Sequence, residues 1–147
     1  MLIASVALVG LFIATYLMLY KLGRIGTLSC SIGSCETVNA SRYATLAGFP
    51  VAMWGVGFYV ATLAVSLLGT AEKFETNRTI SWTLVAMSGW GVLFSSWLTY
   101  LELAVIHAIC QWCVVSAILV VVIFLLSLSD LRERATDELA GTDGVME

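Results

Sequence analysis

The sequence predicts an all-α integral membrane protein, a bundle of four transmembrane helices with a short amphipathic surface helix in the first long loop. Of its 147 residues, 60% are hydrophobic and only 12% are charged, whereas soluble domains are about 45–50% apolar and about 25% charged. Four stretches without acidic or basic residues are long enough to span a bilayer: 2–20, 51–68, 80–101 and 108–128. Backbone polar groups in lipid must be satisfied within the segment, so these stretches are expected to be helices.

The composition argues against two other interpretations of the chain. A signal peptide would begin with basic residues and end in an A-x-A cleavage pattern, and the first apolar stretch has neither feature. We therefore expect residues 2–20 to remain in the protein as a helix. The net charge is −3 and the sequence contains no basic patch, so a nucleic-acid partner is not expected.

Four spanning helices place both termini on one side of the membrane and the segments 21–50 and 102–107 on the other. The side with segments 21–50 and 102–107 carries three basic residues: Lys21, Arg24 and Arg42. The side with the termini carries four: Lys73, Arg78, Arg132 and Arg134. Basic residues favour the cytoplasmic side, so the count favours cytoplasmic termini, although Lys21 and Arg24 taken alone favour the opposite orientation.

The polar segments differ in their expected structure. Residues 70–79 form a short connection without cysteine, 102–107 a tight connector, and 129–147 a charged tail of weak helical character. Within the long loop, 36–47 is expected to be one short helix, because its apolar residues follow helical spacing: Ala40, Tyr43, Ala44 and Ala47. Such a helix would lie along the membrane surface as a lid over the bundle.

The four cysteines form two closely spaced pairs on the same predicted side of the membrane. Cys30 and Cys35 lie in the loop as C-x4-C, and Cys110 and Cys113 lie as C-Q-W-C at the start of the fourth span. Residues three apart share one helix face, and the start of a helix stabilises a thiolate, which is the nucleophile. We therefore expect Cys110 to be the accessible sulfur and Cys113 to lie one turn deeper.

A flexible loop pair can move between an external thiol and Cys110, and each thiol–disulfide exchange passes two electrons. This spacing thus favours a redox relay. Two alternatives remain open from the spacing alone: two static structural disulfides, or a zinc or iron–sulfur site with four thiolate ligands. A bundle of this size does not need disulfides for stability, which argues against the first alternative. The sequence shows no further cluster of metal ligands, so no metal is expected.

Two polar residues precede the C-Q-W-C pair. His107 and Glu102 are expected to be interfacial polar residues of the connector. A sharper role, considered for both His107 and Glu102, would be to donate a proton or to stabilise the Cys110 thiolate.

The stretch CETVNASRYATLAGFPVAMWG, from Cys35 to Gly55, resembles bacterial members of the vitamin K epoxide reductase family. Members of that family have four spanning helices around a quinone, a loop cysteine pair, a serine shortly after it and a C-x-x-C on the fourth helix. The matching positions here are Cys30, Cys35, Ser41, Cys110 and Cys113.

The resemblance implies that the protein oxidises a thioredoxin-like partner and reduces ubiquinone or menaquinone. It implies a multi-pass protein of the bacterial inner (plasma) membrane, with the cysteines on the extracytoplasmic side and the termini in the cytoplasm. Many bacterial members carry a fused thioredoxin-like domain after a fifth helix. This sequence shows none, so a separate periplasmic or extracytoplasmic partner is expected.

The expected quinone-binding residues are Ser41, Tyr43, Val51, Trp54 and Ala117. Ser41 matches the family serine, Tyr43 belongs to the apolar stripe, and Trp54 is one of several tryptophans able to line the pocket. Vertebrate members carry an Asn and a Tyr linked to the quinone pocket where this chain has Val51 and Ala117. Reduction of vitamin K epoxide itself is therefore not implied.

The resulting hypothesis is a membrane thiol:quinone oxidoreductase that uses Cys30, Cys35, Cys110 and Cys113 as its catalytic residues. Residues 1–128 would form the four-helix quinone-binding redox domain, and 129–147 the polar C-terminal tail. The alternative is a membrane scaffold protein whose disulfides are purely structural.

Overall fold

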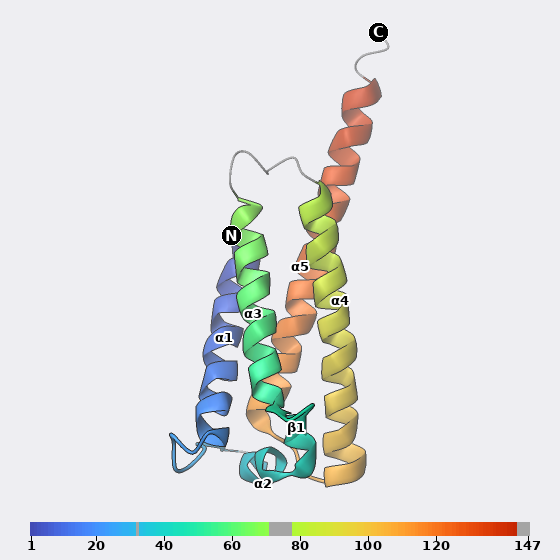
Figure 1. Cartoon of the computed structure of the whole chain (residues 1–147). Helices are drawn as coiled ribbons and strands as arrows, with labels where there is room; N and C mark the ends of the chain where they lie inside the picture. Colours follow the sequence, from blue (N-terminus) through green and yellow to red (C-terminus); the bar gives the residue numbers. More distant parts are fainter. Residues whose placement is uncertain (32, 71–77, 144–147) are drawn as a thin grey trace.

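A computed structural model describes residues 1–31, 33–70 and 78–143 of the chain. It confirms the predicted all-α bundle. The four long helices are α1 (Leu2–Lys21), α3 (Val51–Leu68), α4 (Arg78–Leu101) and α5 (Gln111–Asp143), as Figure 1 shows. All four are long and apolar enough to cross a membrane, so the chain is a multi-pass membrane protein.

The helices alternate in direction, and α2 (Cys35–Ala40) lies with the first loop at one end of the bundle (Figure 1). We call this end the cysteine end. The N-terminus and the C-terminal part of α5 lie toward the opposite end, where α5 extends past the other helices. Helix α1 packs mainly on α3, and α4 packs mainly on α5. The N-terminus and the end of α5 therefore lie at the end of the bundle opposite the cysteines, as the sequence predicts.

A glycine and a buried tyrosine set the contact between α1 and α3. Tyr59 is only 1% exposed, and its ring lies where a Cβ atom on Gly10 would stand. The Tyr59 hydroxyl lies 2.8 Å from the Ser116 hydroxyl and donates to the Ser116 carbonyl at 3.0 Å. Small residues allow helices to approach closely in membranes, and this tyrosine also links α3 to α5.

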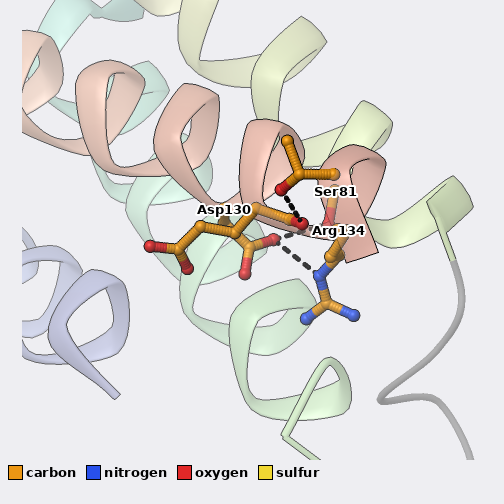
Figure 2. A network of polar contacts seen from close by, with 5 residues as sticks. Ser81, Asp130 and Arg134 are labelled. Atoms are coloured by element: carbon orange, nitrogen blue, oxygen red, sulfur yellow. Dashed lines mark hydrogen bonds and ion pairs between the residues drawn. The ribbon is translucent and has the colours of Figure 1, made fainter. Parts of the chain in front are cut away.

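A polar network joins α4 to α5 near the other end of the bundle (Figure 2). The Ser81 hydroxyl donates to Asp130 Oδ2 at 2.5 Å, and Arg134 Nε donates to the same oxygen at 3.0 Å. Ser81 is 1% exposed. A polar group at this depth needs a partner within the protein, and the aspartate supplies it across the helix pair.

The prediction of one helix over 36–47 is wrong in extent. Helix α2 ends at Ala40, and it is followed by a 3-10 turn, η1 (Arg42–Ala44), and a small hairpin of β1 (Thr45–Leu46) and β2 (Phe49–Pro50). The Ser41 hydroxyl donates to the Val38 carbonyl at 2.7 Å, a local bond that competes with helix continuation. The hairpin turn then uses positive φ angles at Ala47 and Gly48. Glycine adopts this conformation readily and alanine only at a cost.

The connector and the tail also differ from expectation. Residues Glu102–Ile106 form a π-helical segment, η2, which continues α4 and ends at His107 in a left-handed conformation (φ 54°, ψ 32°). Helix α5 begins at Gln111 and continues to Asp143, through most of the segment expected to be a weakly helical tail. Residues 144–147 of that tail, and most of the predicted connection 70–79, lie outside the described residues.

The contact between Gly10 and Tyr59 predicts a stability effect. Gly10→Ala should destabilise the bundle by about 1–3 kcal/mol, because the new methyl group overlaps a packed ring. The measurement is the Tm of the purified protein in detergent.

Gly57→Ala is the matched control for Gly10→Ala. It also lies inside a helix, but a Cβ atom there meets nothing within 4 Å. Its Tm should therefore be unchanged or slightly higher, since alanine favours helix by about 0.5–1 kcal/mol. Equal Tm values for the two variants would contradict the close packing.

Candidate functional site

The two predicted cysteine pairs are both present at the cysteine end, in different redox states. Cys30 and Cys35 form a disulfide with a Cα–Cα distance of 6.3 Å, and Cys110 and Cys113 are free thiols. Cys35 opens α2 and is only 1% exposed, whereas Cys30 is half-buried. The loop pair is thus oxidised while the helix pair is reduced.

Backbone pairing holds the loop disulfide against the start of α5. Gly33 pairs with Cys110 in an isolated antiparallel bridge, and the Ser34 amide donates to the Ile109 carbonyl at 2.9 Å. Gly33 has φ +89°, and a Cβ atom there would overlap the Ile109 carbonyl oxygen. Only glycine therefore permits this approach.

The two residues between Cys110 and Cys113 hold the loop on either side of Cys30. The Trp112 indole N–H donates to the Ser29 carbonyl at 2.9 Å, and the Ser31 amide donates to Gln111 Oε1 at 3.1 Å. The Trp112 ring also meets Tyr16 of α1 edge to face, at 5.8 Å between ring centroids. The C-Q-W-C motif thus supplies loop contacts as well as sulfurs.

Cys110 is buried, so the expectation that it is the accessible sulfur is wrong. Its exposed fraction is 0%, because it packs in a buried cluster that includes Cys35 while Gly33 pairs with its backbone. The Cys113 amide donates to Cys110 Sγ at 3.4 Å, and the Asn39 amide nitrogen lies 3.9 Å from the same sulfur. A hydrogen bond from the Cys113 thiol lowers the pKa of Cys110, against the opposing effect of burial. Cys110 is therefore a protected, thiolate-prone sulfur at the start of a helix.

Cys113 lies deeper, on the wall of an apolar cavity of about 740 Å³. The cavity lies between α3, α4 and α5, with residues of α2 and the hairpin covering it. Large apolar side chains form much of the wall, among them Phe58, Trp90, Phe94 and Leu98. All five residues predicted to bind the quinone also line it: Ser41, Tyr43, Val51, Trp54 and Ala117. The structure therefore brings them together with Cys113; their role in binding stays a prediction.

Glu102 is the site residue whose burial the sequence did not indicate, although a role beside Cys110 is one of the two interpretations considered for it. It was expected at the interface, but it is 6% exposed, and its Oε2 accepts the Cys110 amide at 3.0 Å. Its carboxyl group also interacts with the Cys113 thiol and lines the cavity. His107, by contrast, is exposed. The available signal was that Glu102 is the one acid between the third span and Cys110.

Within residues 1–31, 33–70 and 78–143, no three His, Cys, Asp or Glu side chains are grouped so that they could hold a metal ion. The described cysteines are instead arranged as a disulfide beside a thiol pair.

A thiol pair with a disulfide on one side and an apolar cavity on the other is the arrangement of a membrane thiol oxidoreductase. The chain belongs to the vitamin K epoxide reductase family, whose family model matches residues 1–128. No curated protein matches the chain significantly. Membership in this family implies thiol oxidation coupled to quinone reduction, and the cysteine pairs, the membrane helices and the cavity agree with that class of activity.

The burial of Cys110 beneath Gly33 predicts a change in thiol accessibility. Gly33→Ala forces an unfavourable left-handed conformation that costs about 1–2 kcal/mol, in addition to the overlap with Ile109. Because 1.4 kcal/mol corresponds to tenfold, Cys110 should react with an alkylating reagent about ten times faster. Peptide mapping of the alkylated protein locates the modified sulfur.

Gly48→Ala provides the matched control for the loop variant. Gly48 also has a positive φ, +84°, but a Cβ atom there meets nothing within 4 Å. Alkylation of Cys110 should therefore stay at the wild-type rate. An equal increase in both variants would show that general destabilisation, not release of the loop, exposes Cys110.

Proposed function

We propose that this protein is a thiol:quinone oxidoreductase that reoxidises a thioredoxin-like, disulfide-forming partner and reduces ubiquinone or menaquinone. Electrons pass from the partner to Cys30–Cys35, then to Cys110–Cys113, and then to the quinone. The observation that carries the proposal is the placement of the helix pair. Cys110 lies against the loop that holds the disulfide, and Cys113 faces the apolar cavity.

The burial of the loop cysteines supports a division of labour between them. Cys35 and Cys110 belong to the same buried cluster, whereas Cys30 is half-buried between the exposed Ser29 and Ser31. We propose that Cys30 meets the thiolate of the partner and that Cys35 exchanges with Cys110. A partner protein then needs no access to the membrane interior.

Each exchange step is an ordinary thiolate attack on a disulfide sulfur. A partner thiolate attacks Cys30, and the mixed disulfide is resolved by the partner's second thiol, which leaves Cys30 and Cys35 reduced. The Cys35 thiolate then attacks Cys110 of an oxidised helix pair and displaces Cys113 as a thiolate, which takes up a proton. Cys30 then attacks Cys35 and releases Cys110. The loop returns to the disulfide, and two electrons reside on Cys110 and Cys113, the state that the structure describes.

The cavity fits a quinone in size and chemistry. Ligand cavities are about 300–1,000 Å³ and mainly apolar, with a few placed polar groups, and this one is about 740 Å³. A bound quinone supplies an acceptor for two electrons and two protons. We propose that Tyr43, Val51, Trp54 and Ala117 contact it, with Ser41 as a polar neighbour. Val51 and Ala117 offer no side-chain hydrogen bond, which favours a simple quinone over an epoxide.

The proposed cellular setting follows from the redox chemistry. Cytosolic thiols are kept reduced, so a thiol oxidase should expose its cysteine end to an oxidising compartment. We propose the bacterial inner membrane, with the cysteine end extracytoplasmic, the termini cytoplasmic and a separate thioredoxin-like partner. We also propose residues 1–128 as the quinone-binding redox domain and 129–147 as its polar extension. The scaffold alternative, with static disulfides only, is less compatible with free thiols at Cys110 and Cys113.

The proposed function is tested by quinone reduction with two kinds of electron donor. Purified protein should reduce a soluble quinone analogue with dithiothreitol and with a reduced thioredoxin-like protein. Cys30→Ala and Cys35→Ala should reduce activity with the protein donor to background, because the partner cannot reach Cys110 beneath the loop. They should retain part of the dithiothreitol activity. Absorbance of the quinone is the measurement, and equal losses with both donors would contradict the relay.

The order of the sulfurs is tested by trapping the mixed disulfide. In Cys113→Ser, Cys110 can attack the loop disulfide, but no neighbouring thiol on α5 can release it. A bond between Cys110 and Cys35 should therefore accumulate, and non-reducing peptide mapping identifies it. In Cys110→Ser, little bonding between Cys113 and the loop should form. A bond from Cys110 to Cys30 would reverse the assigned loop roles.

A further inference from the structure

Glu102 is a buried acid beside the Cys110–Cys113 pair, where that pair adjoins the cavity. It is the first residue of the π-helical segment η2, at the cysteine end of α4. Among the described residues that line the cavity, it is the only carboxylate. The ion pair present in the described part of the chain, Asp130 with Arg134, lies at the opposite end of the bundle. A buried carboxylate is costly unless its contacts compensate, so this position calls for a specific role.

The contacts of Glu102 connect it to both sulfurs of the helix pair. Its Oε2 accepts the Cys110 amide at 3.0 Å, which fixes the carboxyl group across the start of α5. The carboxyl group also interacts with the Cys113 thiol, whose S–H group bonds mainly to Cys110 Sγ. Glu102 is therefore a polar neighbour of the thiol that faces the cavity, and it faces the same cavity.

The reaction proposed above needs such a group. When Cys110 and Cys113 form a disulfide, the Cys113 S–H bond must break, and its proton must leave an apolar cavity. Hydroxyl and amide groups on the wall, such as Ser116 and Asn39, are poor proton acceptors near neutral pH. A carboxylate that is fixed on the Cys110 amide and shares the cavity wall with Cys113 is placed to serve as its general base.

We propose that Glu102 is the proton carrier between the Cys113 thiol and the quinone, an inference that rests on the proposed function. Glu102 takes the proton of the Cys113 S–H bond as the Cys110–Cys113 disulfide forms. The two electrons of the thiol pair pass to the quinone. Glu102 then gives its proton to one quinone oxygen and returns to the carboxylate. Cys110 reacts as a thiolate, so it has already lost its proton to water. Water supplies the second proton of the reaction to the other quinone oxygen.

The test uses Glu102→Gln, which keeps the shape and a carbonyl oxygen able to accept the Cys110 amide but cannot carry a proton. The kcat for quinone reduction should fall by about 10²–10⁴-fold, the usual contribution of a general acid–base group. The quinone KM and the formation of the Cys35–Cys110 mixed disulfide in a Cys113→Ser background should be unchanged. A merely structural role would instead alter KM, Tm or loop exchange. Glu102→Asp, which retains a carboxyl group, should restore part of kcat.

Glu36→Gln is the matched acid-to-amide control. Glu36 lies in the first turn of α2 at the same end of the protein, is exposed and is absent from the cavity wall. Its Oε1 accepts the Leu28 amide at 3.4 Å, a bond that the amide oxygen of glutamine can keep. It should retain wild-type kcat. A second measurement requires no quinone: infrared difference spectra of the protein with the helix pair reduced and oxidised. The carboxyl stretching band should shift in wild type and Glu36→Gln, because oxidation removes the Cys113 S–H group beside the Glu102 carboxyl group. It should be missing in Glu102→Gln.

Glu102→Gln activity within threefold of wild type, or a wild-type infrared spectrum without the carboxyl shift, would overturn the role of Glu102. The infrared result decides the question even if Glu102→Gln does not fold. Failure of wild-type protein to reduce any quinone would contradict the proposed function itself. The two failures are therefore distinguishable.

Discussion

The backbone pairing between Gly33 and Cys110 is the contact on which the rest of the site depends. Because Gly33 lacks a Cβ atom, the loop can lie directly on the residues before α5. That contact buries Cys110 and places the loop disulfide beside it. It also allows Trp112 and Gln111 to hold the backbone on either side of Cys30. Two sulfur pairs that are about 75 residues apart in the sequence are thereby brought side by side.

Polar contacts between the helices explain how the bundle holds this geometry in an apolar solvent. Without water to compete for them, buried hydroxyl and carboxyl groups need partners inside the protein. The Ser81–Asp130–Arg134 network fastens α4 to α5 at one end, and Glu102 fastens the end of α4 to the start of α5 at the other. The cavity lies beside α4 and α5, which are joined at both ends. Cys113 on the cavity wall is therefore held in place.

Hydropathy made the spans predictable, because apolar length is nearly sufficient to define a membrane helix. The pairing of the cysteines followed from their spacing. Their common side followed from the number of spans, because alternate loops of a multi-pass protein lie on the same side of the membrane. The end of α2 at Ala40 could not be predicted in this way. The hydrophobic pattern over 36–47 gives no sign of the bond from the Ser41 hydroxyl to the Val38 carbonyl. Nor could the sequence show that Cys110 and Glu102 are buried. Burial at those positions depends on a loop 75 residues away and on the π-helical course of the chain after Leu101.

The cavity opens toward the lipid, and this opening affects how its occupancy by quinone depends on concentration. Trp54 and Trp90 line the cavity and are 49% and 71% exposed on membrane-spanning helices, so the rim reaches the lipid-facing surface. A hydrophobic quinone dissolved in the bilayer can then arrive sideways without crossing water. Under the proposed function, the quantity that governs turnover is the mole fraction of quinone in the lipid. Diluting the membranes with buffer leaves that fraction unchanged, whereas diluting the quinone with added lipid lowers it.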